Sequence, residues 1–260
     1  MIFTNSIDSI LFAAGPIEVR WYGMLFAVGL LLNYLLLRWV FGREKFNVAD
    51  LDSLILYLFV GLVVGARLGH VFFYNAEYFL NDPIKILQIW NGGLASHGAA
   101  IGVFLAYLIW AWIHKVKFTK YADYMILGMP ISAGFVRIGN YFNSEIVGKA
   151  TDGSWGVVFQ RLGEDFPRHP SQFYEAGLSF AIFAVLISIY LKWKKRSPLS
   201  LMFLYMGLYF STRFLVEFFK KRHTISVDFP LSMGQMLSIL PILIAIGAAV
   251  FYYSKRHKAK

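Results

Sequence analysis

Three arginines interrupt the long apolar runs of this 260-residue chain, at Arg67, Arg137 and Arg213. A charged side chain inside a membrane-spanning helix costs about 2.5–3.5 kcal/mol on insertion scales, so several in one chain usually mark a functional cavity. Arginine suits a phosphate, because its planar guanidinium donates two parallel hydrogen bonds and keeps its charge when buried. The three positions therefore favour the binding of an anionic group.

A carboxylate accompanies the last of these arginines. Arg213 and Glu217 are four residues apart, a spacing that places both side chains on one face of a helix. Two interpretations of this pair stay open. It is either a structural ion pair, or a site in which Arg213 binds the anionic ligand while Glu217 holds the guanidinium in place.

The densest polar segment runs from Arg137 to Gly148 and contains two asparagines and a glutamate. Arg137, Asn140 and Asn143 recur at every third position, so they could line one face of a helix. Glu145 follows two residues later. Packing alone does not require this many polar groups beside an intramembrane arginine, so we interpret the segment as part of a ligand site.

A histidine stands at the start of another apolar run, where His97 follows Gly92 and Gly93. Histidine has an ordinary pKa of about 6.5, which makes His97 the natural general base among these residues. A simple hydrogen-bonding role is the alternative. No second histidine lies at a metal-binding spacing, so no metal site is predicted. The chain has no Cys, so any thiol chemistry would need a thiol from the substrate.

Two further polar groups enter apolar runs at Ser171 and Glu175. Ser171 could cap the helix that it begins, but capping does not explain a glutamate one turn further into the membrane. No G-x-S-x-G motif surrounds this serine, so a serine hydrolase is not favoured. Tyr22 and the preceding Trp21 suit the aromatic belt of a membrane protein.

Composition identifies the elements that must carry these residues. Hydrophobic residues make up 58% of the chain and charged residues 15%, against roughly 25% charged in an average globular domain. A soluble protein of this size could not bury so much apolar surface, so we predict a multi-pass membrane protein, one all-α integral domain over residues 1–260. Seven runs approach the roughly 20 residues that cross a bilayer. They are Trp21–Phe41, Leu51–Tyr74, Leu94–Ile113, Ala122–Phe142, Gln172–Tyr190, Leu199–Phe219 and Leu231–Tyr253.

Loop charges predict the orientation of these spans. The net charge is +10, and Lys and Arg fall in short clusters between apolar runs, which favours membrane topology over nucleic-acid binding. Fourteen of the 25 lie in loops on one side and eight on the other, including the cluster 220–222, and three lie within spans. The positive-inside rule then predicts an external N-terminus and a cytoplasmic C-terminus. The loop Asn143–Pro170 is expected to form a small external head with a possible β-hairpin.

With this orientation, six of the seven spans bring polar groups to the same leaflet. The outer side of the membrane would receive Tyr22, Arg67, His97, Arg137, Ser171, Glu175, Arg213 and Glu217. The inner halves of the spans are largely apolar. The candidate site is therefore expected near the outer leaflet.

In these motifs the sequence resembles the bacterial prolipoprotein diacylglyceryl transferases. The motifs that carry the resemblance are Arg20-Trp21-Tyr22-Gly23, Gly65-Ala66-Arg67-Leu68-Gly69, Gly92-Gly93 through His97-Gly98, Arg137 through Gly148, His169 through Glu175, Arg213 through Phe218, and Gly234-Gln235. Two positions depart from the family's pattern: Val136 stands where a glycine is usual before Arg137, and Ala99 stands where a second glycine usually follows Gly98. Neither change removes a reactive group.

The resemblance implies a reaction in the bacterial cytoplasmic membrane. The diacylglyceryl group of phosphatidylglycerol would pass to the lipobox Cys thiol of an exported prolipoprotein, forming a thioether and releasing glycerol 1-phosphate. Its partners would be that lipid, signal peptides with a lipobox cysteine, and the surrounding membrane lipids. No cofactor is implied.

The resemblance and the residue chemistry together assign roles. The catalytic residues would be His97, Arg137, Arg213, Glu145 and Tyr22. The substrate-binding residues would be Arg137, Asn140, Gly148, Arg213, Glu217, Arg67, Ser171 and Glu175. Within this scheme the arginines stabilise charge on the leaving phosphate, and His97 deprotonates the thiol or, alternatively, only organises the site while the arginine field lowers the thiol pKa.

Two other function classes compete with this interpretation. A small-anion transporter could use the same arginines as a binding site, although its polar groups would be expected near the midplane and within inverted repeats. A non-catalytic lipid-binding scaffold would fit the composition, but it would give no purpose to His97, Glu145 and Glu175.

Overall fold

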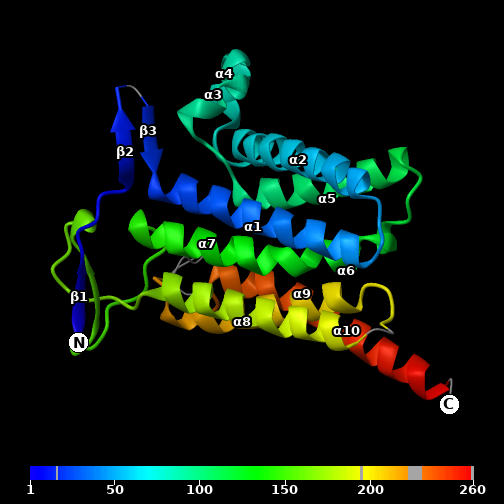
Figure 1. The fold of residues 1–260 in the computed structure, drawn as a ribbon. Coiled ribbons are helices and arrows are strands. Elements are labelled where there is room, and N and C mark those ends of the chain that lie inside the picture. The colour runs from blue at the N-terminus through cyan, green and yellow to red at the C-terminus, as the bar shows by residue number, and fades with distance from the viewer. Residues whose placement is uncertain (16, 194–195, 222–229, 259–260) are drawn as a thin grey trace. The chain divides into compact units, whose positions relative to one another are not determined.

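The computed structural model describes residues 1–15, 17–193, 196–221 and 230–258 and is mainly helical (Figure 1). Its helices are α1 Trp21–Arg43, α2 Val48–Tyr74, α3 Ala76–Asn81, α4 Ile84–Leu87, α5 Ser96–Ile113, α6 Ala122–Met125, α7 Met129–Phe142, α8 Ser171–Lys192, α9 Ser200–Val216 and α10 Met233–Lys258. Four short strands accompany them: β1 Ile2–Asn5, β2 Ile10–Ala14, β3 Ile17–Arg20 and β4 Gly156–Phe159.

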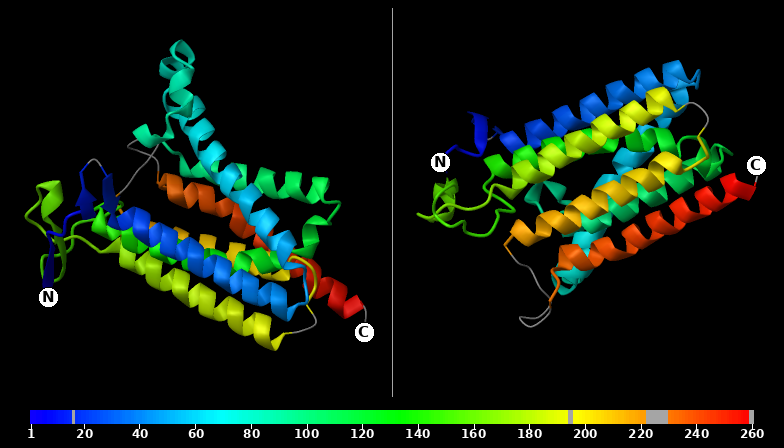
Figure 2. Two further views of the ribbon diagram at one scale, coloured as in Figure 1. Left: turned by 45° about the horizontal axis from the view of Figure 1, so that its top comes forward. Right: turned by 90° about the horizontal axis from the view of Figure 1, so that it is seen from below.

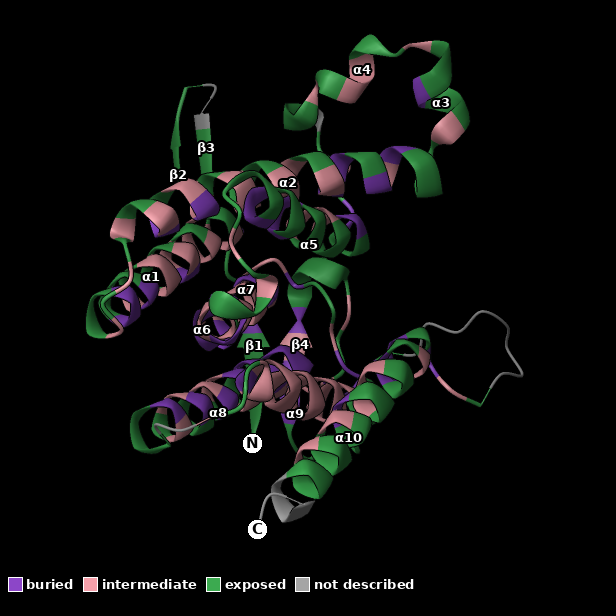
Figure 3. Cartoon of the chain, turned by 90° about the vertical axis from the view of Figure 1, so that its right-hand side faces the viewer, coloured by how far each residue is buried: buried purple, intermediate pink, exposed green. Residues whose placement is uncertain are grey.

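Within the described residues, six helices are long and apolar enough to cross a membrane: α1, α2, α5, α8, α9 with the turn after it, and α10. Only 11% of the most apolar stretch of α2 is buried within the protein, and the same holds for α10. Figure 3 shows the exposed surface along α10. Such apolar and uncovered helices require lipid around them, which confirms a multi-pass membrane protein.

The predicted span Ala122–Phe142 is divided. α6 gives way to a 3₁₀ turn at Ile126–Gly128, and α7 begins immediately after it with Pro130 in its first turn. Proline has no N–H to donate to the preceding turn and is best tolerated where a helix begins, so the helix restarts at this point. The predicted fourth span is therefore two short helices in series.

The structure consists of two compact units, residues 1–37 with 122–260, and residues 38–121. In the first unit α7 packs against α8, α8 against α9, and α9 against α10, so segments far apart in the sequence run side by side (Figure 2). This row of helices places the second half of the Arg137–Gly148 segment beside the start of α8.

The loop 143–170 does not fold as the predicted hairpin. β4 lies in this loop but pairs in parallel with β1, from Ile2 opposite Gly156 to Asn5 opposite Phe159. On its other side Val157 forms an isolated bridge with Arg168. The N-terminal residues, which carry no strong strand pattern, thus supply the partner strand, and the Asn5 side chain fastens them by donating to the Tyr141 carbonyl at 2.9 Å.

In the second unit α2 and α5 pack closely enough that glycines of the two helices touch. The Ala95 N–H donates to the Ala66 carbonyl at 2.9 Å, directly before α5 begins. Close backbone approach of this kind is typical of small residues at membrane-helix interfaces. The contact fixes the start of α5, where His97 stands.

Candidate active site

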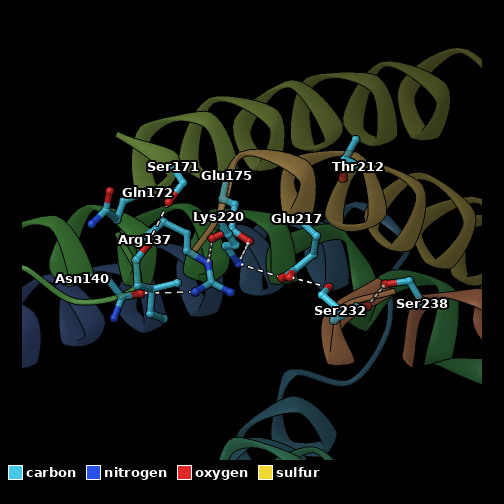
Figure 4. A network of polar contacts seen from close by, with 12 residues as sticks. Arg137, Asn140, Ser171, Gln172, Glu175, Thr212, Glu217, Lys220, Ser232 and Ser238 are labelled. Carbon is cyan, nitrogen blue, oxygen red and sulfur yellow. Dashed lines mark hydrogen bonds and ion pairs between the residues drawn. The ribbon is translucent and has the colours of Figure 1, made fainter. Parts of the chain in front are cut away.

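Arg137 of α7 and Glu175 of α8 form the centre of a polar network in the first unit (Figure 4). Arg137 Nε lies 3.1 Å from Glu175 Oε2, with side chains only 15% and 9% exposed. Arg137 Nη1 also donates to Asn140 Oδ1 at 3.3 Å, one helical turn along α7. The packing of α7 against α8 therefore brings together a cation and a carboxylate that sequence spacing alone could not pair.

Of the three residues predicted to share a helix face, Asn140 and Asn143 both contact one carboxylate, that of Glu145. Asn140 Nδ2 donates to Glu145 Oε2 at 3.1 Å, and Asn143 Nδ2 donates to Glu145 Oε1 at 3.2 Å. α7 ends at Phe142, and the turn after it folds Glu145 back toward the helix. Two amides thus fix both oxygens of this carboxylate at the end of the Arg137–Asn140 chain.

Tyr22 at the start of α1 reaches the same group of residues. Its ring packs against Gly139, and its hydroxyl interacts electrostatically with Arg137 and Glu145. The aromatic-belt interpretation is therefore incomplete, because Tyr22 faces the polar network of α7.

Ser171 does not cap α8. It is the first residue of the helix, and the preceding Pro170 occupies the cap position without a side-chain hydrogen bond. The Ser171 hydroxyl donates instead to the Ile146 carbonyl at 2.8 Å, and the amide of the neighbouring Gln172 donates to the Glu145 carbonyl at 2.7 Å. Both side chains are fully buried and hold the segment after α7 against α8. Sequence reasoning did not identify Gln172.

Gly148 lies where three segments meet. Its N–H donates to the His169 carbonyl at 3.1 Å, and it faces Lys220 in an isolated antiparallel bridge. A Cβ at this position would collide with the His169 backbone. Only glycine fits here, which explains its place in the polar segment without a direct contact to a ligand.

Lys220 is a buried member of the network that the sequence interpretation counted as a loop charge. Its ammonium lies 2.8 Å from Glu175 Oε1 and 3.3 Å from Glu217 Oε1, and the residue is 7% exposed. Arg222, which belongs to the same predicted cluster, lies outside the described residues. The sequence did contain one sign of this pairing, because Glu217 and Lys220 are three residues apart at the end of an apolar run.

The predicted contact between Arg213 and Glu217 is not formed. α9 ends at Val216 and a 3₁₀ turn follows, but Glu217 keeps helical dihedral angles and its N–H donates to the Arg213 carbonyl, so the two residues remain one turn apart. Glu217 instead accepts from Lys220 and from the Ser232 hydroxyl, the latter at 2.8 Å. The predicted pair is absent because Lys220 and Ser232 hold the Glu217 carboxylate instead.

Arg213 is left as a half-buried cation to which no ion pair or hydrogen bond is assigned within the described part of the chain. It borders a cavity of about 10 Å³, room for about one water molecule. The lining residues are Arg137, Glu175, Leu178, Ser179, Tyr209, Thr212, Arg213 and Val216. Two arginines thus line one small space, and one of them, Arg213, has no protein acceptor assigned among the described residues.

Arg67, in the second unit, is fully occupied. Its five N–H groups donate to the carbonyls of Lys85, Ile86, Gln88, Gly92 and Gly93, at distances between 2.5 and 3.2 Å. Its guanidinium also lies 4.8 Å from the ring centroid of Phe79. This arrangement favours a scaffolding role over the predicted contact with substrate, because every guanidinium N–H already has a carbonyl acceptor.

His97, also in the second unit, is exposed in the first turn of α5. No hydrogen bond to its ring is assigned within the described ranges, so both ring nitrogens are available to a substrate. Among all the residues that the structure describes, no three His, Asp or Glu side chains are placed to hold a metal ion.

Outside the helices, the buried side chain of Arg168 fixes the loop 143–170. Its side chain forms an ion pair with Glu164 and donates to the Gly148 carbonyl at 3.0 Å. The hydrogen bonds from Arg168 lower the pKa of the Glu164 carboxyl below its ordinary value. Sequence reasoning counted Arg168 only as a loop charge, but it is buried and holds the loop against Gly148.

Comparisons with known proteins agree with one another. A family model described as prolipoprotein diacylglyceryl transferase matches residues 9–253. Three relatives are each named phosphatidylglycerol–prolipoprotein diacylglyceryl transferase. The one from Tolumonas auensis is 44% identical over the whole of both chains. Those from Chloroherpeton thalassium and Bordetella parapertussis are 42% and 37% identical, over 91% and 98% of this chain and 89% and 98% of their own.

Proposed function

Because the chain belongs to the prolipoprotein diacylglyceryl transferase family, we propose that the cavity beside Arg213 is the site of its reaction. The protein is an inner-membrane, multi-pass transferase of lipoprotein biosynthesis that moves the diacylglyceryl group of phosphatidylglycerol to a prolipoprotein. The small-anion transporter that intramembrane arginines alone would allow finds no support in these relatives.

The bonds that change require stabilisation of an anionic leaving group. The lipobox Cys sulfur attacks a glyceryl carbon, a C–S bond forms, and the C–O bond to the phosphate breaks. The phosphate oxygen takes the electron pair and leaves as glycerol 1-phosphate. Cations already aimed at the position of that developing charge lower the barrier without reorganisation.

The observation that carries this proposal is Arg213, unpaired within the described residues, beside the paired Arg137. Arg137 is held by Glu175 and Asn140, so its guanidinium is fixed in direction. Arg213 has no assigned carboxylate partner, so no ion pair has to break before it binds an anion. The lipid phosphate would serve as the acceptor for Arg213 and enlarge the small cavity that both arginines line.

The remaining roles are assigned by residue chemistry. Asn140 and Glu145 orient Arg137, and Tyr22, which packs beside them, positions the lipid. The thiolate is the nucleophile, so a base must accept the thiol proton. We assign the proton to the imidazole of His97.

Supporting residues complete the site. Glu175 of α8 lines the cavity, Ser171 at the start of the same helix holds the segment after α7, and Gly148 joins that segment to His169 and Lys220. Arg67 is placed with the substrate-binding residues only through its family motif, and its hydrogen bonds favour a scaffold.

For the membrane arrangement we propose seven crossings, with α6 and α7 together forming the fourth. The N-terminus and loop 143–170 would lie outside, the C-terminus in the cytoplasm, and the site toward the outer leaflet. Burial of Lys220 supports this orientation, because a lysine paired inside the protein no longer counts among the outer loop charges.

The test is a direct transfer assay. Purified protein in detergent is mixed with phosphatidylglycerol and a peptide that carries a lipobox cysteine, and the peptide mass is measured. We expect a gain of one diacylglyceryl unit, and no gain when the peptide Cys is replaced by Ser. Retained binding of anionic lipid without any mass change would refute the transferase and return the protein to a binding or scaffold role.

A further inference from the structure

Lys220 lies beside the proposed site but has no role in the reaction described above. It follows the 3₁₀ turn Glu217–Phe219 and is almost fully buried. Figure 4 shows its ammonium between two carboxylates, those of Glu175 and Glu217. Lysine is rarely buried unless it is paired, and here two acceptors compensate for the lost hydration.

Glu217 is fixed from the opposite side as well. Its Oε2 accepts from the Ser232 hydroxyl at 2.8 Å. Its carboxyl group also lies against Gly234, where any Cβ would collide with it. Ser232 is itself locked by Gln235, because the Ser232 N–H donates to Gln235 Oε1 at 2.9 Å and the Gln235 N–H donates back to Ser232 Oγ at 3.1 Å. The carboxylate is therefore held toward the start of α10.

These contacts separate two residues that would otherwise pair. Arg213 and Glu217 are one turn apart, and arginine with carboxylate is among the strongest side-chain pairs. An Arg213 bound to Glu217 would have to release that carboxylate before it could bind a phosphate. The Ser232 hydroxyl alone offers Glu217 one neutral donor, whereas Lys220 offers a buried charge.

We propose that Lys220 is a positioning residue that holds Glu217 away from Arg213 and so keeps the Arg213 guanidinium available for the phosphate of the lipid substrate. The proposal rests on the function proposed above. It predicts that the charge of Lys220 matters through Glu217, and that the effect appears in the binding of phosphatidylglycerol rather than in the chemical step.

The experiment compares variants of the full-length protein in mixed micelles, with phosphatidylglycerol varied at saturating lipobox peptide. Lys220→Met should raise the KM for the lipid about tenfold, the loss expected when an internal ion pair worth about 1.4 kcal/mol competes with the ligand. Lys220→Arg keeps the positive charge and should leave the KM for the lipid near the wild-type value. The matched control is Lys221→Met, which removes the same charge from an exposed neighbour and should leave the KM unchanged.

The decisive variant is the double substitution of Lys220→Met with Glu217→Gln. A neutral amide in place of the Glu217 carboxylate cannot capture Arg213 as an ion pair, so the KM should return toward the wild-type value. A double variant as impaired as the single one would overturn the proposal and leave Lys220 with an ordinary packing role. If Lys220→Met lowers the unfolding temperature, Lys220→Gln supplies a second neutral variant, and the same recovery by Glu217→Gln is required.

Failure of the underlying function would look different. A wild-type protein that transfers nothing from phosphatidylglycerol would overturn both proposals together. Wild-type transfer with an unchanged KM in Lys220→Met would overturn only the role of Lys220.

Discussion

The two arginines at the cavity should respond differently to the same substitution, because they differ in their assigned partners. Arg137 Nε lies 3.1 Å from Glu175, and the two side chains are 15% and 9% exposed. Arg213 is half-buried and has no assigned acceptor within the described residues. We therefore expect Arg213→Met to lower activity strongly without affecting folding, and Arg137→Met to lower both activity and stability.

The magnitudes follow from these contacts. Loss of one preorganised donor to a developing negative charge costs about 10²–10³ in rate, or about 2.7–4 kcal/mol. Arg213→Met should therefore lower kcat/KM by about that factor and change the free energy of unfolding by no more than about 0.5 kcal/mol. Breaking a buried ion pair costs about 3–5 kcal/mol. Lys220 still compensates Glu175 in Arg137→Met, so we expect about 2 kcal/mol there, a fall in unfolding temperature of about 4–8 °C.

The assay measures both quantities on one preparation. Transfer to the lipobox peptide is followed by mass, and unfolding by tryptophan fluorescence during heating in the same detergent. Arg161→Met is the control, since it removes an exposed arginine from the loop. An Arg213→Met protein that keeps more than about a third of the wild-type kcat/KM would refute the phosphate role. Equal unfolding temperatures for the Arg213 and Arg137 variants below wild type would refute the argument from pairing.

Three further predictions concern the rest of the molecule. His97→Gln should slow transfer by about 10²–10⁴, and a variant that transfers at the wild-type rate would exclude the general-base role. Arg67→Lys should lower the unfolding temperature, because three ammonium hydrogens cannot serve five carbonyls, and an unchanged temperature would contradict the scaffold. Arg168 lowers the pKa of Glu164, so their pair stabilises the protein above the unfolded carboxyl pKa of about 4.3 and loses this effect as the pH falls through the lower folded value. Glu164→Gln should flatten that acid limb of the stability curve, and an equally steep limb would show that other groups cause it.

The sequence was informative where chemistry and position along one helix coincide. Apolar runs predicted the long helices, and the three-residue spacing predicted that Arg137 and Asn140 would meet, as they do at 3.3 Å. Both inferences need only the period of a helix and the cost of charge in lipid. The interruption before Pro130 needs only the missing N–H of proline.

Pairings between distant segments could not be obtained in this way. Lys220 meets Glu175 across 45 positions of sequence, and no local spacing encodes that contact. The same limit applies to β1, whose partner β4 lies far along the chain in the loop after α7. Hydropathy assigned Lys220 to a loop because it stands at the end of an apolar run among other cations. Only the packing of α8 against α9 shows that its charge lies inside the protein.

Among the three cations in and beside this site, the more deeply buried a cation is, the more acceptors it has. Lys220, the most buried, has two carboxylates, and Arg137, slightly less buried, has one carboxylate and one amide. Arg213, a half-buried residue, has no assigned acceptor within the described ranges. Removing an unpaired charge from water is costly, so a cation without a protein partner is tolerated only where water still reaches it. The lipid phosphate should therefore approach from the side of Arg213, displace its water first, and then meet the fixed guanidinium of Arg137.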